Sequence, residues 1–244
     1  MTEVTSAVAA PAVRTIARPP GTLAAAWVIA RKDLAIEFRT RSAFLSALVL
    51  SLLSLVIFFF AWDPTAVGPL DLAPGVLWVT FTFSGLLGMH RSFGVEARDG
   101  AMDALLVSPV PREAIFIGKG LANLVFVLGV QAIALPAIAL FYNLPITRSF
   151  VALAGVMILA AIGLACIGTL FAGMTANTRM AELLLPVLAL PFFVPIVIPA
   201  AQSTADLLAG RPVSESFGYL RILLAFDLVF VFACTVAFPF TLED

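Results

Sequence analysis

Six long runs of apolar residues divide the 244-residue sequence, and each is long enough to cross a lipid bilayer as a helix. We place them near residues 43–62, 72–89, 120–142, 149–173, 183–201 and 222–240. The runs are continuous and do not alternate in polarity, which disfavours a transmembrane β-barrel. A helix also satisfies its own backbone hydrogen bonds in lipid. The sequence therefore predicts an all-α integral membrane protein with six transmembrane helices.

The composition agrees with this class. Hydrophobic residues make up 61% of the chain and charged residues only 12%, against roughly 25% charged in a soluble domain. The net charge of −1 and the lack of a basic stripe give no sign of a nucleic-acid partner. Gly118-Lys119, the one Gly-Lys pair, lacks the other residues of a nucleotide-binding loop. We therefore expect no enzyme in this chain, and any ATP must be bound by another chain.

Lysine and arginine residues are distributed unequally between the two sides of the predicted membrane domain. The N-terminal segment and the second and fourth connections hold eleven, whereas the first, third and fifth connections hold three. Positive residues favour the cytoplasmic side. We therefore expect both termini, and the connection between the second and third spans, to be cytoplasmic.

The chain before the first span has two parts. Residues 1–22 are rich in Ala, Thr, Val and Pro, and we expect them to be a disordered cytoplasmic tail. Residues 23–42 place Leu23, Trp27, Ala30, Leu34 and Phe38 on one helical face, which favours an amphipathic helix at the membrane surface. The alternative is a positively charged flank that only sets topology. Residues 43–244 then form the six-helix transmembrane domain.

The connection at 90–119 carries an unusual share of the charge. Asp99 is a good helix N-cap, Asp103 suits the first turn, and Met102, Leu105 and Leu106 form one apolar helical face. Proline residues then end this helix and begin the next one. The pattern predicts a short amphipathic helix at the cytoplasmic tip of two long helices. As a contact surface for a partner ATPase, we single out Glu96, Asp99, Gly100, Met102, Asp103, Leu105, Leu106 and Pro109.

Residues 73–123 resemble the cytochrome c maturation protein B family, the haem exporter permeases of an ATP-binding-cassette system. The family's Pro-Gly-x-x-Trp start of the second span matches Pro74, Gly75 and Trp78. Its loop pattern of Asp-Gly, Leu and Pro matches Asp99, Gly100, Leu105, Leu106 and Pro109. The loop alone also resembles the wider type-2 ABC exporter permeases, and beyond residue 123 the agreement is one of pattern.

The resemblance implies a fold, a location and a set of partners. The fold is that of the type-2 ABC exporter permeases in the bacterial inner membrane. The partners are the ATPase, cytochrome c maturation protein A, the membrane proteins C and D, and the periplasmic haem chaperone E. Haem is then a possible cargo, ATP is bound by the partner, and two copies of this chain are expected in each complex. A permease for a lipid, drug or polysaccharide and a non-cycling assembly scaffold stay open as alternatives.

A few residues within the spans are candidates for transport or gating. Asp227 is the one acid inside a predicted span, where a charge at the helix centre costs about 2.5–3.5 kcal/mol. We expect it to face the bundle interior, as a functional group or as a structural hydrogen-bond partner. Pro191 and Pro195 belong to a proline-rich fifth span, which we expect to be broken or partly re-entrant, or else simply kinked. Trp78 completes this candidate set.

The remaining polar and sulfur-containing residues favour structural roles. Cys166 and Cys234 fall within spans and lack metal-ligand spacing, so packing is the favoured interpretation. His90 has no second ligand nearby and is interpreted as a residue at the membrane boundary. Gly155, Gly163, Gly168 and Gly173 in the fourth span predict close helix packing. The sequence thus names no resident metal or cofactor.

Overall fold

The computed structural model describes residues 21–98, 110–145, 149–176, 178 and 180–241. Within these ranges the regular structure is entirely helical, with no strand. The helices, in chain order, are α1 (Thr22–Thr40), α2 (Ser42–Ala61), α3 (Pro69–Arg98), α5 (Arg112–Tyr142), α6 (Phe150–Thr175), α7 (Ala181–Leu208) and α8 (Phe217–Thr241). Six of them are long and apolar enough to cross a membrane: α2, α3, α5, α6, α7 and α8. This confirms the predicted all-α membrane fold.

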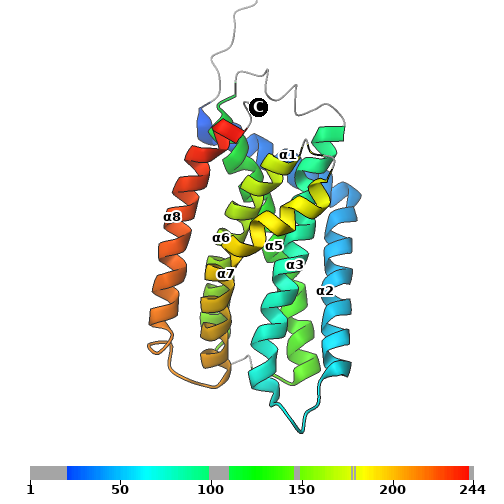
Figure 1. Ribbon diagram of the computed structural model, residues 1–244, viewed down its shortest axis with the longest axis vertical. Coiled ribbons are helices and arrows are strands. Elements are labelled where there is room, and N and C mark those ends of the chain that lie inside the picture. The colour runs from blue at the N-terminus through cyan, green and yellow to red at the C-terminus, as the bar shows by residue number, and fades with distance from the viewer. Residues whose placement is uncertain (1–20, 99–109, 146–148, 177, 179, 242–244) are drawn as a thin grey trace, which may run out of the picture.

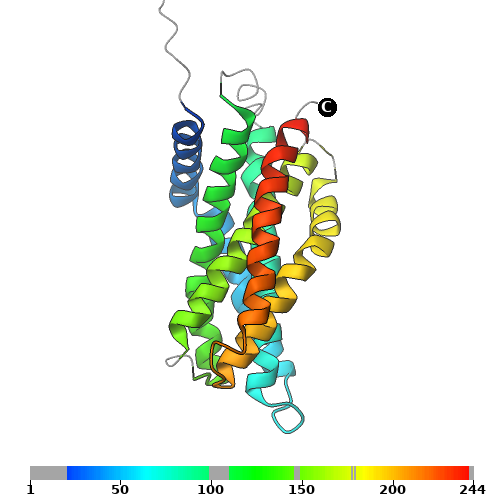
Figure 2. The same ribbon diagram turned by 90° about the vertical axis from the view of Figure 1, so that its left-hand side faces the viewer.

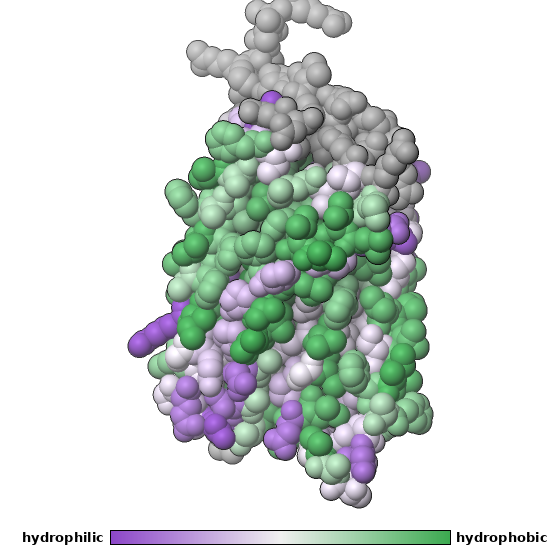
Figure 3. Space-filling view, in the orientation of Figure 1, coloured by the Kyte–Doolittle hydropathy of each residue, from purple (hydrophilic) through white to green (hydrophobic). Residues whose placement is uncertain are grey.

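The six long helices stand side by side in one elongated bundle, and α1 lies across one end of it (Figures 1 and 2). The inner helices are α3, α5 and α6, whereas α2 and α8 bury the smallest share of their apolar windows. Apolar residues cover the flank seen in Figure 3, and hydrophilic residues gather at the end that holds the α7–α8 connection. An apolar flank suits the hydrocarbon core of a bilayer, and the hydrophilic end suits the headgroup region and water beside it.

Several spans are longer than the apolar runs that predicted them. The helix of the second span begins at Pro69 and continues to Arg98, beyond the predicted limits of 72 and 89. That of the fifth span covers Ala181–Leu208, against a predicted 183–201. Hydrophobicity marks only the part of a helix that lies in hydrocarbon, while polar turns continue the helix on either side. The sequence therefore predicts the positions of these spans correctly but underestimates the lengths of their helices.

Small residues allow the inner helices to approach closely. A Cβ atom added to Gly168 would collide with the thioether of Met89 in α3, and one added to Gly173 would lie 2.8 Å from the Phe238 ring in α8. By contrast, a Cβ atom at Gly155 would meet nothing within 4 Å. Close packing is therefore confirmed for part of the predicted glycine set in α6.

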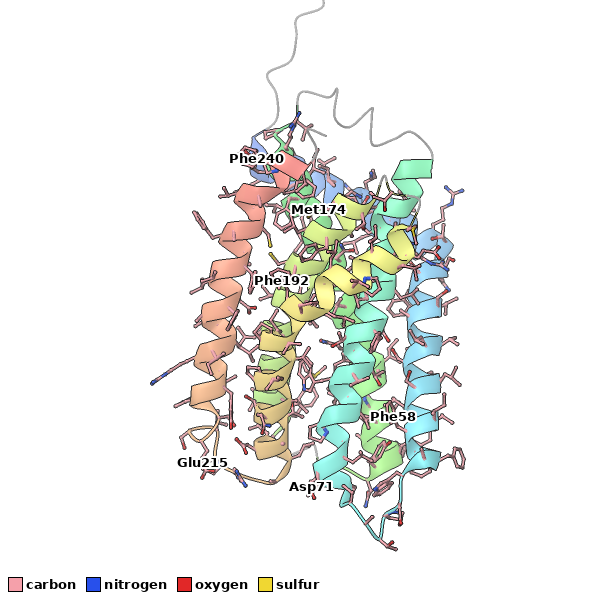
Figure 4. The ribbon with its side chains drawn as sticks, in the orientation of Figure 1. Phe58, Asp71, Met174, Phe192, Glu215 and Phe240 are labelled. Carbon is pink, nitrogen blue, oxygen red and sulfur yellow. The ribbon has the colours of Figure 1, made fainter. Side chains whose placement is uncertain are left out.

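The proline-rich fifth span is one continuous helix, so the expectation of a broken or re-entrant segment is wrong. Four prolines lie inside α7, at positions 186, 191, 195 and 199. The helix bends, with its first part oblique and its second part upright, and Phe192 lies near the bend (Figures 1 and 4). Each proline removes one backbone donor without abolishing the neighbouring hydrogen bonds, so a kink suffices.

Candidate functional site

Among the described residues, the arginine and lysine side chains that bond one helix to another lie at one end of the bundle. It comprises α1, the part of α3 from His90 onward, the start of α5 up to Lys119 and the end of α8 from Thr235, and we call it the loop end. The chain between the end of α3 at Arg98 and the start of α5 at Arg112 holds most of the predicted ATPase contact, and we call it the coupling segment. Met174 and Phe240 lie toward this end, and Asp71 and Glu215 lie toward the opposite end (Figure 4). The loop end is therefore the candidate site for contact with a partner.

Arginine side chains tie neighbouring helices together at the loop end. Arg91 of α3 donates from Nη1 to the Ser42 hydroxyl at the start of α2, at 2.6 Å. Arg112, the first residue of α5, donates from Nη1 to the Pro239 carbonyl oxygen in α8, at 3.2 Å. The two helices that flank the coupling segment are thus each bonded to a neighbouring span.

A tight corner joins α1 to α2. Arg41 adopts a left-handed conformation with φ of 55° between the two helices. The Glu37 carboxylate then accepts a hydrogen bond of 2.7 Å from the Phe44 amide in the first turn of α2. A carboxylate is favourable there because the first amides of a helix have no partner within the helix. The corner fixes the direction in which α1 leaves the bundle.

A buried lysine joins three helices at the same end. The Lys119 side chain of α5 is fully buried, and its Nζ lies 3.1 Å from Oδ2 of Asp33 in α1. The same Nζ donates to the Ser92 carbonyl oxygen of α3 at 3.1 Å and lies 4.6 Å from the centre of the Phe93 ring. A buried ammonium requires such compensation, because its desolvation costs several kcal/mol. No motif in the sequence links these residues, which we call the Lys119 clamp.

Helix α1 contacts the bundle through a face that shares only Ala30 with the predicted amphipathic face. Its buried residues are Ala25, Ala26, Ile29 and Ala30. The predicted apolar face is largely exposed, with exposed fractions of 77% for Leu23, 61% for Trp27 and 72% for Phe38. Small side chains allow α1 to approach Gly118 of α5, where an added Cβ would lie 2.6 Å from the Ala26 carbonyl oxygen. Close approach, more than hydrophobicity, decides this contact.

Most of the predicted ATPase-contact residues lie outside the described residues. These are Asp99, Gly100, Met102, Asp103, Leu105, Leu106 and Pro109. Glu96 belongs to the last turns of α3. The predicted start of the following helix agrees with the structure, because Pro111 is the N-cap of α5 and Glu113 lies in its first turn.

Asp227 faces the interior of the bundle, as predicted. It is 4% exposed, and neither carboxyl oxygen has a hydrogen-bond partner among the described residues. A Cβ added to Gly163 of α6 would lie 2.5 Å from Oδ1 of Asp227 and 2.7 Å from Cδ1 of Ile196 in α7. The carboxyl group of α8 is therefore packed directly against α6, close to α7, with no room for another group between it and Gly163.

Trp78 is fully buried and connects α3 to α7. Its indole Nε1 donates to the Thr204 hydroxyl at 3.0 Å, and its ring meets Phe81 edge-on. Pro191 is exposed and Pro195 is half-buried on α7. The candidate gating residues therefore do not form one cluster. Trp78 marks a contact between α3 and α7, and Asp227 marks one between α8 and α6.

The interior also holds polar groups that the sequence analysis did not select. The hydroxyls of Ser51 and Ser84 are 2.6 Å apart between α2 and α3, and Asn123 donates to Thr169 at 2.9 Å between α5 and α6. The Gln131 amide is 1% exposed and has no hydrogen-bond partner among the described residues. Such groups follow no periodic pattern along one helix, so only the packing of two helices reveals them.

At the opposite end, the Ala61-Trp62-Asp63 triplet forms a local turn after α2. Trp62 donates from Nε1 to the Val67 carbonyl oxygen at 2.9 Å. The Asp63 carboxylate accepts hydrogen bonds from the hydroxyl and the amide of Thr65, and these bonds lower the pKa of Asp63. The side chains of Trp62 and Asp63 thus form hydrogen bonds within this turn.

Taken together, six long apolar helices packed in one bundle define a multi-pass membrane protein. The chain belongs to the CcmB protein family, whose model matches residues 24–244. It is 30% identical over 171 residues to heme exporter protein B of Rhodobacter capsulatus, covering 70% of this chain and 78% of that protein. It is also 30% identical to heme exporter protein B of Paracoccus denitrificans, over 73% of this chain and 82% of the relative. It is likewise 30% identical to the protein of the same name from Pseudomonas aeruginosa, over 68% of this chain and 76% of that protein.

Proposed function

We propose that this chain is the permease subunit of an ATP-binding-cassette complex in cytochrome c biogenesis. It couples ATP hydrolysis by a partner ATPase to haem export or to release of a haem-loaded chaperone. The observation that carries this proposal is membership of the CcmB family along nearly the whole chain, with relatives that are named heme exporter protein B. The subunit itself is not an enzyme, and ATP is bound by the partner.

The proposed surroundings follow from the same relationship. The chain lies in the bacterial inner membrane with both termini cytoplasmic, in agreement with the unequal distribution of its Lys and Arg residues. The partners are the ATPase, cytochrome c maturation protein A, the membrane proteins C and D, and the periplasmic chaperone E. Haem is the cargo of the complex, and no residue of this chain is assigned to it.

The ATPase contacts the segment between α3 and α5. Two features support this location: the capped amphipathic pattern of residues 99–106, and the bonds that tie both flanking helices to neighbouring spans. A docked ATPase can move several helices only if these helices are joined near the contact. An apolar helical face is also a common docking element for a groove on a partner.

Replacing Leu105 and Leu106 with Asp tests the proposal. The double variant should still insert into the membrane, because neither residue belongs to a span, but the ATPase should be lost when the chain is purified from solubilised membranes. Val213→Asp is the matched control, since Val213 is an exposed apolar residue in the connection at the opposite end. Recovery of the ATPase at the wild-type ratio with the double variant would contradict the proposal.

A further inference from the structure

The Lys119 clamp lies close to both ends of the segment that we propose as the ATPase contact. Ser92 and Phe93 precede the end of α3 at Arg98 by fewer than seven residues, and Lys119 follows the start of α5 at Arg112 by seven. At 1.5 Å of rise per residue, these separations are about 10 Å along each helix. A force on the segment therefore reaches the clamp through less than two turns of each helix.

The clamp is also the point where α1 is fastened to both of these helices. Asp33 provides the contact from α1, and its own neighbour Lys32 lies 3.2 Å from Oδ1, so the carboxylate is shared between a buried and a half-exposed ammonium. One turn earlier on the α5 side, Ala25 and Ala26 pack against Ala114. Val110 and Ile117 pack against this alanine cluster, and Gly118 lies close to Ala26 and Ile29. The side chains of this contact are all apolar. The charged contact supplies the directional part of the attachment.

A purely structural attachment would not need this chemistry. A buried ion pair is often no more stabilising than apolar side chains of similar volume, because both ions lose their hydration. What it does provide is a single geometry, since the ammonium here satisfies an acid, a carbonyl oxygen and a ring face on two other helices. Such a contact adds a directional, charged restraint against sliding of α1 over α5 to the apolar packing of the two helices.

We infer that Lys119 is a positioning residue that makes α1 and the adjoining ends of α3 and α5 move as one body when the partner ATPase acts on this end. The inference rests on the proposed function. It predicts that loss of the clamp leaves the ATP site and the ATPase contact intact, because Lys119 is buried inside this chain. The step that suffers is the transmission of movement into the spans.

The test uses membrane vesicles that carry the complete complex and measures kcat and KM for ATP hydrolysis. Lys119→Met keeps the length of the side chain and removes its charge. We expect kcat to fall about three- to thirtyfold, which is the range for mutations that weaken coupling, with KM for ATP and the amount of bound ATPase unchanged. Arg211→Met removes the Arg211–Asp206 pair of 2.9 Å at the opposite end and should leave kcat unchanged. If the Lys119→Met chain does not accumulate, Asp33→Asn weakens the same contact from α1 and should lower kcat to a smaller extent.

A cross-link distinguishes transmission from simple stability. In a chain with Cys166→Ala and Cys234→Ala, the pair Ala25→Cys and Ala114→Cys places two thiols in the packed alanine contact between α1 and α5. Oxidation should restore kcat to the Lys119→Met variant, and a reductant should remove the gain. The same cross-link in a chain that retains Lys119 should leave kcat unchanged, because the two helices already move together.

Three results would overturn the inference. They are a wild-type kcat in Lys119→Met, a loss of bound ATPase in that variant, and a cross-link that blocks hydrolysis when Lys119 is present. The last of these would mean that α1 must slide over α5. Wild-type vesicles that retain no ATPase would instead contradict the proposed function, and the inference would fail with it.

Discussion

At the scale of single residues, several polar side chains are buried in the interior of the bundle. Asp227 is buried beside Gly163 and Ile196, with neither oxygen bonded among the described residues. In lipid, an unsatisfied polar group has no water to which it can hydrogen-bond, so burying such a residue lowers the stability of the protein.

Asp227→Leu should therefore insert and accumulate at least as well as the wild-type chain, because the substitution removes a polar group from the membrane interior. If the carboxyl group serves transport, c-type cytochrome formation should nevertheless fall. Asp227→Asn should be milder if hydrogen bonding is the requirement, and equally severe if charge is. Haem staining of membrane cytochromes measures the effect, and a normal level with Asp227→Leu would reduce the residue to a tolerated polar group.

Gly163 should be indispensable for the same packing. Gly163→Ala forces a methyl group toward Oδ1 of Asp227 and Cδ1 of Ile196, and overpacking of this kind costs about 1–3 kcal/mol. Thermal unfolding of the purified chain in detergent should show a lower Tm than wild type. Gly155→Ala, on the same helix but facing open space, is the control and should not lower the Tm, because alanine favours a helix more than glycine does.

At the scale of elements, the sequence predicts the spans well and the contacts between them poorly. A bilayer accepts only long apolar helices, so the run of 43–62 corresponds closely to α2 at Ser42–Ala61. The buried face of α1 did not follow from its amphipathic pattern, because Ala25 and Ala26 are selected by their small size. The Lys119–Asp33 contact joins residues 86 positions apart. No sequence motif indicates that these two residues lie together.

The bend of α7 gives a second prediction at this scale. Pro191→Ala and Pro195→Ala restore backbone donors near the bend, so the double variant should form a straighter helix and lower c-type cytochrome formation while still inserting. Pro186→Ala, closer to the start of α7, is the comparison and should have a smaller effect. The bend can be followed as a distance between spin labels placed at the two ends of α7. An unchanged distance with unchanged cytochrome formation would show that the prolines have no role in movement.

At the scale of the whole molecule, the proposed ATPase partner determines the expected assembly. A nucleotide-binding dimer has two equivalent docking surfaces, and closed twofold symmetry then requires two copies of this chain. The first or fifth span, α2 or α7, is the expected contact between copies. Native mass measurement of the complex in detergent should give two copies of the chain, and a single copy would contradict this arrangement.

The proposed function requires this chain for the formation of c-type cytochromes. In cells from which the chain has been deleted, haem staining of membrane proteins should show no covalently bound haem in c-type cytochromes. Expression of the wild-type chain should restore it, and expression of the Leu105→Asp and Leu106→Asp double variant should not, because the spans insert without a working ATPase contact. Normal c-type cytochromes in cells that lack the chain would contradict the central claim.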